Sequence, residues 1–207
     1  MRRILAVLLV LIAAGLFGGG CATQSRPQSL AWDVVNLKDN DWSGSPRELP
    51  VIEGDDLVLR GKEVRTQRTY SAPVTVEFDA MLEEKLANDG ALTCVIVPVT
   101  QAVDLDLERG LMLQFRYDHS GDWMSVYELF QHRPVYQGKD WSSSPLTIKP
   151  GSWHHLKYEV VKDGLRITVD GQSYTSGGAV VTYDTFYIEL SGWQPVNRWH
   201  VRNFTVH

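Results

Sequence analysis

The chain has 207 residues, of which 43% are hydrophobic, and its 25 acidic residues outnumber its 20 lysines and arginines. The formal charge of −5 at pH 7 argues against nucleic acid as a partner, because phosphate binding needs a basic surface. The length and apolar content are sufficient for one domain with a sizeable core.

Residues 1–20 have the pattern of a secretory signal peptide. Arg2 and Arg3 form a basic start, residues 4–17 are apolar, and three glycines precede Cys21. This arrangement resembles a bacterial lipobox, which implies cleavage before Cys21 and acylation of its thiol. Gly18 departs from that pattern, in which leucine usually stands three residues before the cysteine. A plain secretory signal and an uncleaved anchor are the alternatives.

The rest of the chain divides into a short tether and one domain. Residues 21–30 comprise the lipidated cysteine and a polar linker, and residues 31–207 form the expected domain. Removal of residues 1–20 takes away two arginines and no acidic residue, which moves the formal charge from −5 to −7. Cys94 lies in an apolar run, where a buried and inert thiol is expected.

Strand signals recur along nearly the whole domain. The only segment with a helix-like composition, residues 81–88, reads equally well as a loop. Many short strands separated by turn residues predict an all-β sandwich or barrel. The expected strands are residues 56–60, 74–81, 91–99, 111–118, 123–130, 154–161, 165–170, 185–190 and 201–207.

Two Asp-Gly pairs punctuate residues 152–174. Asp163-Gly164 suits a two-residue hairpin turn, which predicts Val160 opposite Ile167 and Tyr158 opposite Val169 on one apolar face. Asp170-Gly171 then turns the chain again. The resulting meander has one apolar and one solvated side, as in an outer sheet layer.

The hairpin of residues 111–130 carries a different pattern. With residues 119–122 as a four-residue turn, Asp118 faces Trp123, Arg116 faces Ser125 and Gln114 faces Tyr127. One side of the hairpin is apolar and belongs in the core. The other side mixes aromatic rings with hydrogen-bonding groups, as a sugar-binding surface requires. The alternative is a solvated face on which Arg116 pairs with Asp118 or stacks on Trp123.

These segments resemble a known group of domains. Residues 146–172, LTIKPGSWHHLKYEVVKDGLRITVDGQ, are similar to the Trp-initiated strand and hairpin of concanavalin A-like jelly-roll domains. The closing FYIELSGWQPVNRWHVRNFTVH resembles the final strands of laminin-G-like and 3-keto-disaccharide hydrolase-like domains. The likeness covers most of residues 32–207 and implies a sandwich of two antiparallel sheets, with ligands held on the concave sheet or at the loop edge.

The resemblance raises three specific chemistries, two of which depend on acidic residues. A laminarinase-type glycosidase would place Glu77, Asp79 and Glu83 together, but its carboxyl groups must lie about 5 to 5.5 Å apart. Along a strand, Glu77 and Glu83 are separated by roughly 20 Å. Calcium would use the acidic residues of VDLDLERG, but that segment lacks the glycine of a known loop, and we expect no metal. The residues in question are Asp104, Asp106 and Glu108.

The third chemistry is catalysis by histidine. His154 and His155 are adjacent in a strand, so they point to opposite sides of it. His132 lies in an expected loop with polar and aromatic neighbours, but no partner that would orient it is identified. Trp193 and Trp199 are expected to pack at a sheet end, although Trp193 is also a candidate for an exposed loop position.

These observations predict a secreted, lipid-anchored carbohydrate-binding protein without cofactor or metal. The predicted ligand-binding residues are Gln114, Arg116, Asp118, Trp123 and Tyr127, with Trp141 as a wall of the site. One alternative is a glycan-active hydrolase related to 3-keto-disaccharide hydrolases, its acid and base drawn from Asp118, Glu128 and His132. The other is a structural envelope lipoprotein that binds another protein. The expected location is the cell envelope, at the outer membrane or periplasmic face, or outside the cell.

Overall fold

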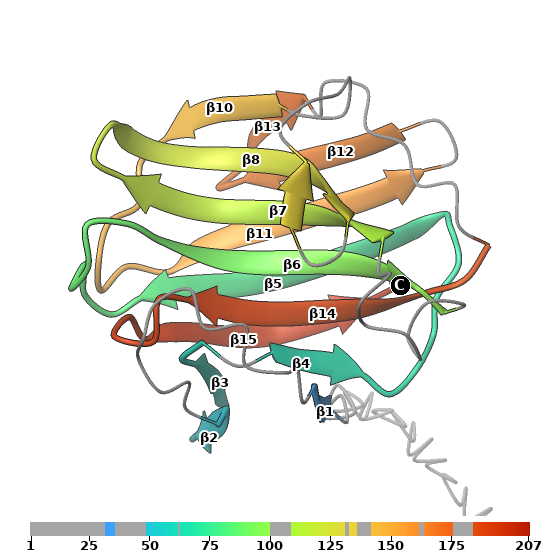
Figure 1. The fold of residues 1–207 in the computed structure, drawn as a ribbon, viewed down its shortest axis with the longest axis horizontal. Helices are drawn as coiled ribbons and strands as arrows, with labels where there is room; N and C mark the ends of the chain where they lie inside the picture. Colours follow the sequence, from blue (N-terminus) through green and yellow to red (C-terminus); the bar gives the residue numbers. More distant parts are fainter. Residues whose placement is uncertain are drawn as a thin grey trace, which may run out of the picture.

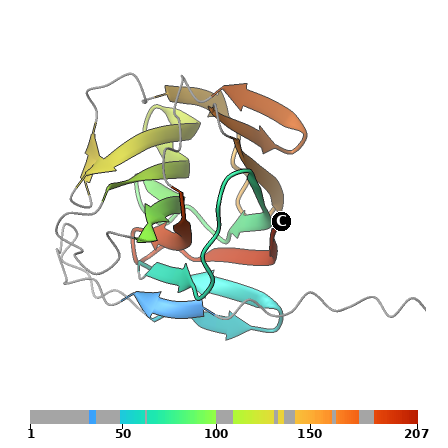
Figure 2. The ribbon, with the colours of Figure 1, turned by 90° about the vertical axis from the view of Figure 1, so that its right-hand side faces the viewer.

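The structure is a computed structural model that describes residues 32–35, 49–61, 63–99, 109–130, 133–135, 142–161, 164–175 and 184–207. These residues form two antiparallel sheets that pack face to face, which confirms the predicted jelly-roll sandwich. Figure 1 shows one sheet in front of the other, and Figure 2 shows them as two layers seen along the strands. No α-helix occurs among the described residues, so this part of the chain holds no helix long enough to cross a membrane.

The first sheet contains the hairpin in which the binding face was predicted. Its strands follow the order β1, β4, β14, β6, β7, β8 and β10, and β9 pairs with β8 beside that path. In that order they are β1 (Trp32–Val35), β4 (Glu63–Thr66), β14 (Phe186–Trp193), β6 (Gly90–Pro98), β7 (Arg109–Asp118), β8 (Gly121–Phe130), β10 (Ser142–Leu146) and β9 (Arg133–Val135).

The second sheet contains the meander with the two Asp-Gly pairs. Its strands follow the order β13, β12, β11, β5, β15, β3 and β2. In that order they are β13 (Gln172–Thr175), β12 (Gly164–Val169), β11 (His154–Val161), β5 (Val74–Leu82), β15 (Trp199–Val206), β3 (Asp56–Leu59) and β2 (Val51–Glu53).

One apolar layer fills the space between the sheets. Aromatic rings cross it: Phe115 of the first sheet meets Trp199 of the second with 5.8 Å between ring centroids. Phe78 packs against Tyr158 at 5.7 Å. All four rings are almost completely buried. The one cysteine among the described residues, Cys94, is free and buried, so this part of the chain is stabilised by apolar packing and not by a disulfide.

The meander confirms the predicted faces but not the predicted pairing. Tyr158 lies opposite Ile167 and Val160 opposite Leu165, two residues from the expected register. The reason is that Gly164 pairs with Val161 and therefore belongs to strand β12, not to the predicted Asp163-Gly164 turn. Asp170-Gly171 is the tight turn expected, with positive φ at both residues, 51° and 80°.

Strand β15 contains a β-bulge next to β5. Arg202 pairs with Asp79 and Thr205 with Glu77, so two residues of β15 stand opposite Phe78 alone. Asn203 has a φ of 54° and is exposed, whereas Phe204 stacks on Phe78 inside the sandwich. The bulge therefore lets Arg202 and Asn203, although consecutive, both reach the outer face.

Candidate functional site

The turn of the β7–β8 hairpin has two residues, whereas the sequence predicted four. Asp118 pairs with Gly121, which leaves only His119 and Ser120 in the loop. Gly121 has a φ of 148°, and the Asp118 carboxylate accepts hydrogen bonds from both the amide and the hydroxyl of Ser120. The positive φ and this capped turn let the strands stay paired two residues further. Arg116 consequently faces Trp123, and the predicted pairing is wrong by two residues.

A shift of two residues leaves each side chain on its expected side of the sheet. The apolar side of the hairpin, which includes Phe115 and Met124, belongs to the main core as predicted. The opposite side carries all five predicted ligand-binding residues that the structure describes. Those residues are Gln114, Arg116, Asp118, Trp123 and Tyr127.

Two of these five residues do not offer an open surface. Tyr127 is 2% exposed and packs with Val95, Val97 and Met112 in a second apolar cluster. Gln114 is 3% exposed and donates a hydrogen bond from its amide to the Met112 sulfur. The expectation of an accessible ring at Tyr127 is therefore wrong, because this face is closed where Gln114 and Tyr127 lie.

Polar pairs occupy the remainder of this closed region. The Thr93 and Ser191 hydroxyls share a 2.7 Å hydrogen bond across β6 and β14. Glu189 is 2% exposed; burial raises the pKa of its carboxyl group, and the Arg65 guanidinium that pairs with it opposes the shift. These partners satisfy the buried groups, so this area supports the sheet.

The other three predicted residues lie toward the hairpin turn, where the surface opens. Arg116 Nη2 is 2.7 Å from Asp118 Oδ2, so the ion pair considered from the sequence is present. The Ser120 hydroxyl lowers the pKa of Asp118, and the Ser120 amide and Arg116 add to that effect against partial desolvation. Trp123 is partly exposed directly across from Arg116.

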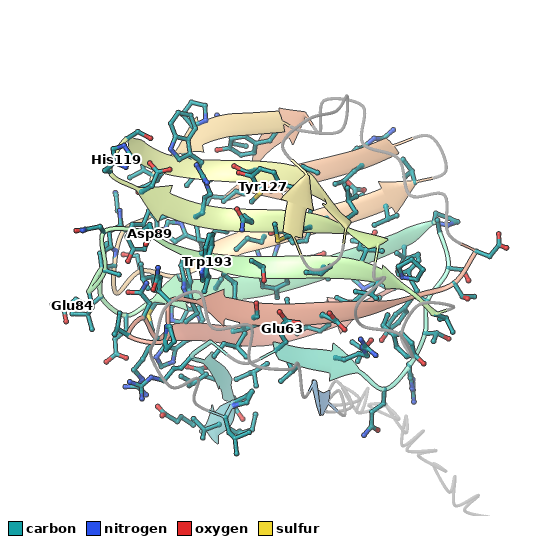
Figure 3. The ribbon with its side chains drawn as sticks, viewed as in Figure 1. Glu63, Glu84, Asp89, His119, Tyr127 and Trp193 are labelled. Atoms are coloured by element: carbon teal, nitrogen blue, oxygen red, sulfur yellow. The ribbon has the colours of Figure 1, made fainter. Side chains whose placement is uncertain are left out.

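A pocket of about 410 Å³ opens beside this ion pair. It lies where β7 ends, β6 begins and β14 ends, at one end of the first sheet (Figure 3). Its wall combines two carboxylates, a guanidinium, a carboxamide, an imidazole and the indole of Trp193, which is 41% exposed. The lining residues are Asn88, Asp89, Gly90, Arg116, Tyr117, Asp118, His119 and Trp193.

Asn197 fixes the shape of this pocket from beneath. It is completely buried, and its side-chain oxygen accepts hydrogen bonds from the Leu86 amide and the Tyr117 hydroxyl. Its amide group donates to the backbone oxygen of Asp89. Gln194 donates a second hydrogen bond, 2.9 Å long, to Asp89 Oδ1. The loop before β6 is thereby tied to the loop after β14.

Sequence reasoning found part of this site. It identified Arg116 and Asp118, and it considered an exposed position for Trp193. It missed Asn88, Asp89 and His119, because their proximity depends on how β6, β7 and β14 end together. The signal available was the Asn-Asp-Gly turn before a predicted strand, since antiparallel pairing brings such a turn beside the end of the next strand.

The carboxylates considered for laminarinase-type hydrolysis lie in or just after β5 of the second sheet, where other side chains pair with them. Glu77 and Asp79 share one outer face of β5, and the exposed His155 contacts both: Nδ1 is 2.8 Å from Asp79 and Nε2 is 3.1 Å from Glu77. Asn203 donates to the other oxygen of Asp79. Glu83 instead contacts Arg198 and His200. Glu83 thus has different partners from the other two carboxylates.

The predicted opposite orientation of His154 and His155 is confirmed. His154 is buried, and its Nδ1 is 2.7 Å from Asp170. No group of three or more possible metal ligands occurs within the described ranges. Cys94 is buried, and burial raises the pKa of its thiol.

Several predicted residues lie outside the described part of the chain. For Glu128, only the backbone in β8 is described. The residues beyond description are Cys21, Asp104, Asp106, Glu108, His132 and Trp141.

Comparison with known proteins supports the fold. No family model matches the sequence, and no curated protein matches it. Among solved structures, the chain is similar to the carbohydrate binding module CBM66 from Bacillus subtilis, with a TM-score of 0.59, 16% identity, and coverage of 86% of this chain and 96% of that one. It is also similar to the metal-free Emp46p carbohydrate recognition domain, with a TM-score of 0.62, 11% identity and coverage of 85% and 87%.

A third similar structure is a β-1,3-glucanase from Mycobacterium marinum, with a TM-score of 0.51, 12% identity and coverage of 87% of this chain and 92% of that one. At these identities the shared property is the jelly-roll sandwich. Domains of this architecture therefore include both sugar-binding proteins and sugar-cleaving enzymes.

Proposed function

We propose that this protein is a secreted, lipid-anchored carbohydrate-binding protein whose ligand occupies the pocket at the end of the first sheet. The observation that carries the proposal is a pocket of about 410 Å³ whose wall combines the half-exposed indole of Trp193 with several polar side chains. That volume falls within the roughly 300 to 1,000 Å³ of typical small-molecule sites. The bound sugar stacks on Trp193 and hydrogen-bonds to the polar wall.

The polar wall offers both acceptors and donors to hydroxyl groups. Asp89 and Asp118 supply acceptors, Arg116 supplies donors, and Asn88 supplies both. The Asn197 hydrogen bonds hold the Asp89 loop in place before a ligand arrives, which reduces the entropy lost on binding. Trp123 extends the site along the hairpin, whereas Gln114 and Tyr127 support it from the closed part of the face.

The similar structures support this proposal by their own functions. The carbohydrate binding module and the carbohydrate recognition domain have most of their length in common with this chain. A shared fold does not transfer a function, so the main support for sugar binding comes from the groups that line the pocket.

The glucanase similarity leaves hydrolysis as a second candidate. Glycoside cleavage needs a carboxylic acid that keeps its proton near neutral pH. Asp118 does not fit that role, because its hydrogen bonds and Arg116 lower its pKa. Its carboxylate serves better as a fixed acceptor for a sugar hydroxyl.

A glycan array followed by isothermal titration calorimetry, which needs no indole reporter, tests the binding proposal. Trp193→Ala should abolish detectable binding of the sugars that the unchanged protein recognises. Trp153→Ala is the matched control, because Trp153 immediately precedes β11 of the second sheet, lies under the Arg202 guanidinium and is outside the pocket lining. Equal affinities of the Trp193→Ala variant and the unchanged protein would reject the site. A stoichiometric protein partner recovered from envelopes, with no sugar bound, would favour the structural-lipoprotein alternative.

The anchor is tested separately by mass spectrometry and fractionation. The protein should carry acyl chains on residue 21 and sediment with membranes. The Cys21→Ser variant should lose both properties while keeping its sugar binding, because the anchor and the pocket are separate parts of the protein. A soluble wild-type protein without acyl chains would contradict the anchor.

A further inference from the structure

The pocket lining carries an unbalanced negative charge. Arg116 and Asp118 neutralise each other at 2.7 Å. Asp89 has no such cation among the described residues; its side chain accepts a hydrogen bond from the uncharged Gln194 amide. The nearby Lys85 is committed to Asp122 at 2.7 Å. The pocket therefore presents one carboxylate whose charge no described side chain balances.

The position of Asp89 makes that carboxylate usable by a ligand. Asp89 is partly exposed and lines the same pocket as the Trp193 indole, and Figure 3 shows both at the same end of the sheet. The hydrogen bond from Gln194 reaches Asp89 Oδ1. Gln194 and Asn197 hold the residue in place, and no described residue hydrogen-bonds to Oδ2, so this oxygen is oriented toward a ligand.

We propose that the pocket prefers sugars with a free amino group, hexosamines that are not acetylated, over neutral sugars and uronates. This inference rests on the proposed function. The ligand's ammonium group donates a charge-assisted hydrogen bond to Asp89 while the ring packs on Trp193. An ammonium near the indole face also gains a cation–π interaction. A uronate brings a second negative charge into a site that already has one in excess.

The charge of the whole chain acts in the same direction. The formal charge is −5, so the field of the protein repels anionic polymers and attracts cationic ones. This long-range contribution falls with added salt, whereas the hydrogen bond at Asp89 is screened less. The preference for the amine should therefore weaken with salt without disappearing.

The test uses the purified protein and matched sets of monosaccharides that differ at one substituent. Each set contains a hexosamine, its N-acetyl form, the parent hexose and the corresponding uronate, in the glucose, galactose and mannose series. Affinities are measured by NMR titration below the pKa of the ligand amine. We expect the hexosamine to bind about tenfold more tightly than the hexose in the series that the pocket recognises.

Two variants assign the preference to one carboxylate. Asp89→Asn keeps an oxygen for Gln194 but removes the charge, so hexosamine affinity should fall about tenfold and hexose affinity should stay constant. Glu84→Gln is the matched control, because Glu84 is an exposed acid on the same loop and does not line the pocket. An unchanged melting temperature of the Asp89→Asn variant shows that the loop still folds.

The outcomes separate the two proposals. Binding of hexoses with no gain for the amine, or an amine gain that Asp89→Asn leaves intact, overturns this inference and leaves carbohydrate binding in place. Absence of binding for every sugar in all three series overturns both. An amine preference lost only in Asp89→Asn supports both.

Discussion

Replacement of Gly90 by alanine should damage the fold and the pocket together. A Cβ atom at this position would lie 2.3 Å from Asn197 Nδ2 and 2.8 Å from the Tyr117 ring. Both neighbours are buried, so neither can swing into solvent. The clash therefore has to be relieved by displacing Asn197, the residue that ties the two pocket loops together.

The magnitude follows from the two costs that this displacement combines. Overpacking a closed site costs about 1 to 3 kcal/mol. Leaving a buried hydrogen-bonding group unsatisfied costs about 1 to 3 kcal/mol more, and both the Leu86 amide and the Tyr117 hydroxyl depend on Asn197. We expect Gly90→Ala to lower the free energy of unfolding by roughly 2 to 6 kcal/mol.

Urea unfolding followed by tryptophan fluorescence measures this loss. Gly164→Ala is the matched control, because a Cβ atom there meets nothing within 4 Å. The control should stay within about 0.5 kcal/mol of the unchanged protein. If Gly90→Ala behaves like the control, the loop is free to move and the pocket is not held rigid by Asn197.

Two further changes test the second sheet and the core. The Asp79 hydrogen bond raises the pKa of His155, so Asp79→Asn should return the NMR titration midpoint of that imidazole toward 6.5. The stabilisation from His155 is complete below pH 6.5 and fades as pH rises through its raised pKa. Partial burial acts to raise the pKa of Asp79, but hydrogen bonds from His155 and Asn203 outweigh it and lower that pKa. The stabilisation from Asp79 is therefore complete above pH 3.8 and is lost as the pH falls through the lowered pKa. The stability difference between the unchanged protein and Asp79→Asn should therefore peak between these limits, and a pH-independent difference in urea unfolding would contradict the pairing. Phe115→Ala should cost about 3 to 5 kcal/mol in the same assay, because its ring joins the two sheets at Trp199; a loss under about 1 kcal/mol would show that the sheets do not depend on this contact.

The sequence predicts the faces of the strands better than their partners. Alternation has a period of two, so Tyr158 and Val160 point inward whether they pair in the expected register or two residues away. The choice between the two registers depends on which residues form the turn. At residues 119–122 it depended on Gly121, which takes a positive φ and still pairs with Asp118.

The candidate site was predictable only where it follows the hairpin. Arg116 and Asp118 follow from alternation along one strand. Tyr127 satisfies the same alternation but lies over the middle of the sheet, and burial there is a property of the whole assembly. Asp89 and Trp193 are 104 positions apart along the chain, and only the pairing of β6 with β14 brings their strands together.

The bulge in β15 makes the effect of a one-residue deletion depend on which residue is lost. Deleting Asn203 would leave Phe204 alone opposite Phe78 and would restore simple alternation, so Phe204 would stay inward and Thr205 would stay opposite Glu77. The local cost would be the amide partner of Asp79. Deleting Phe204 instead would leave Asn203 opposite Phe78 and bring a polar carboxamide to the apolar layer, so two adjacent codons would differ sharply in what their loss does to the sandwich.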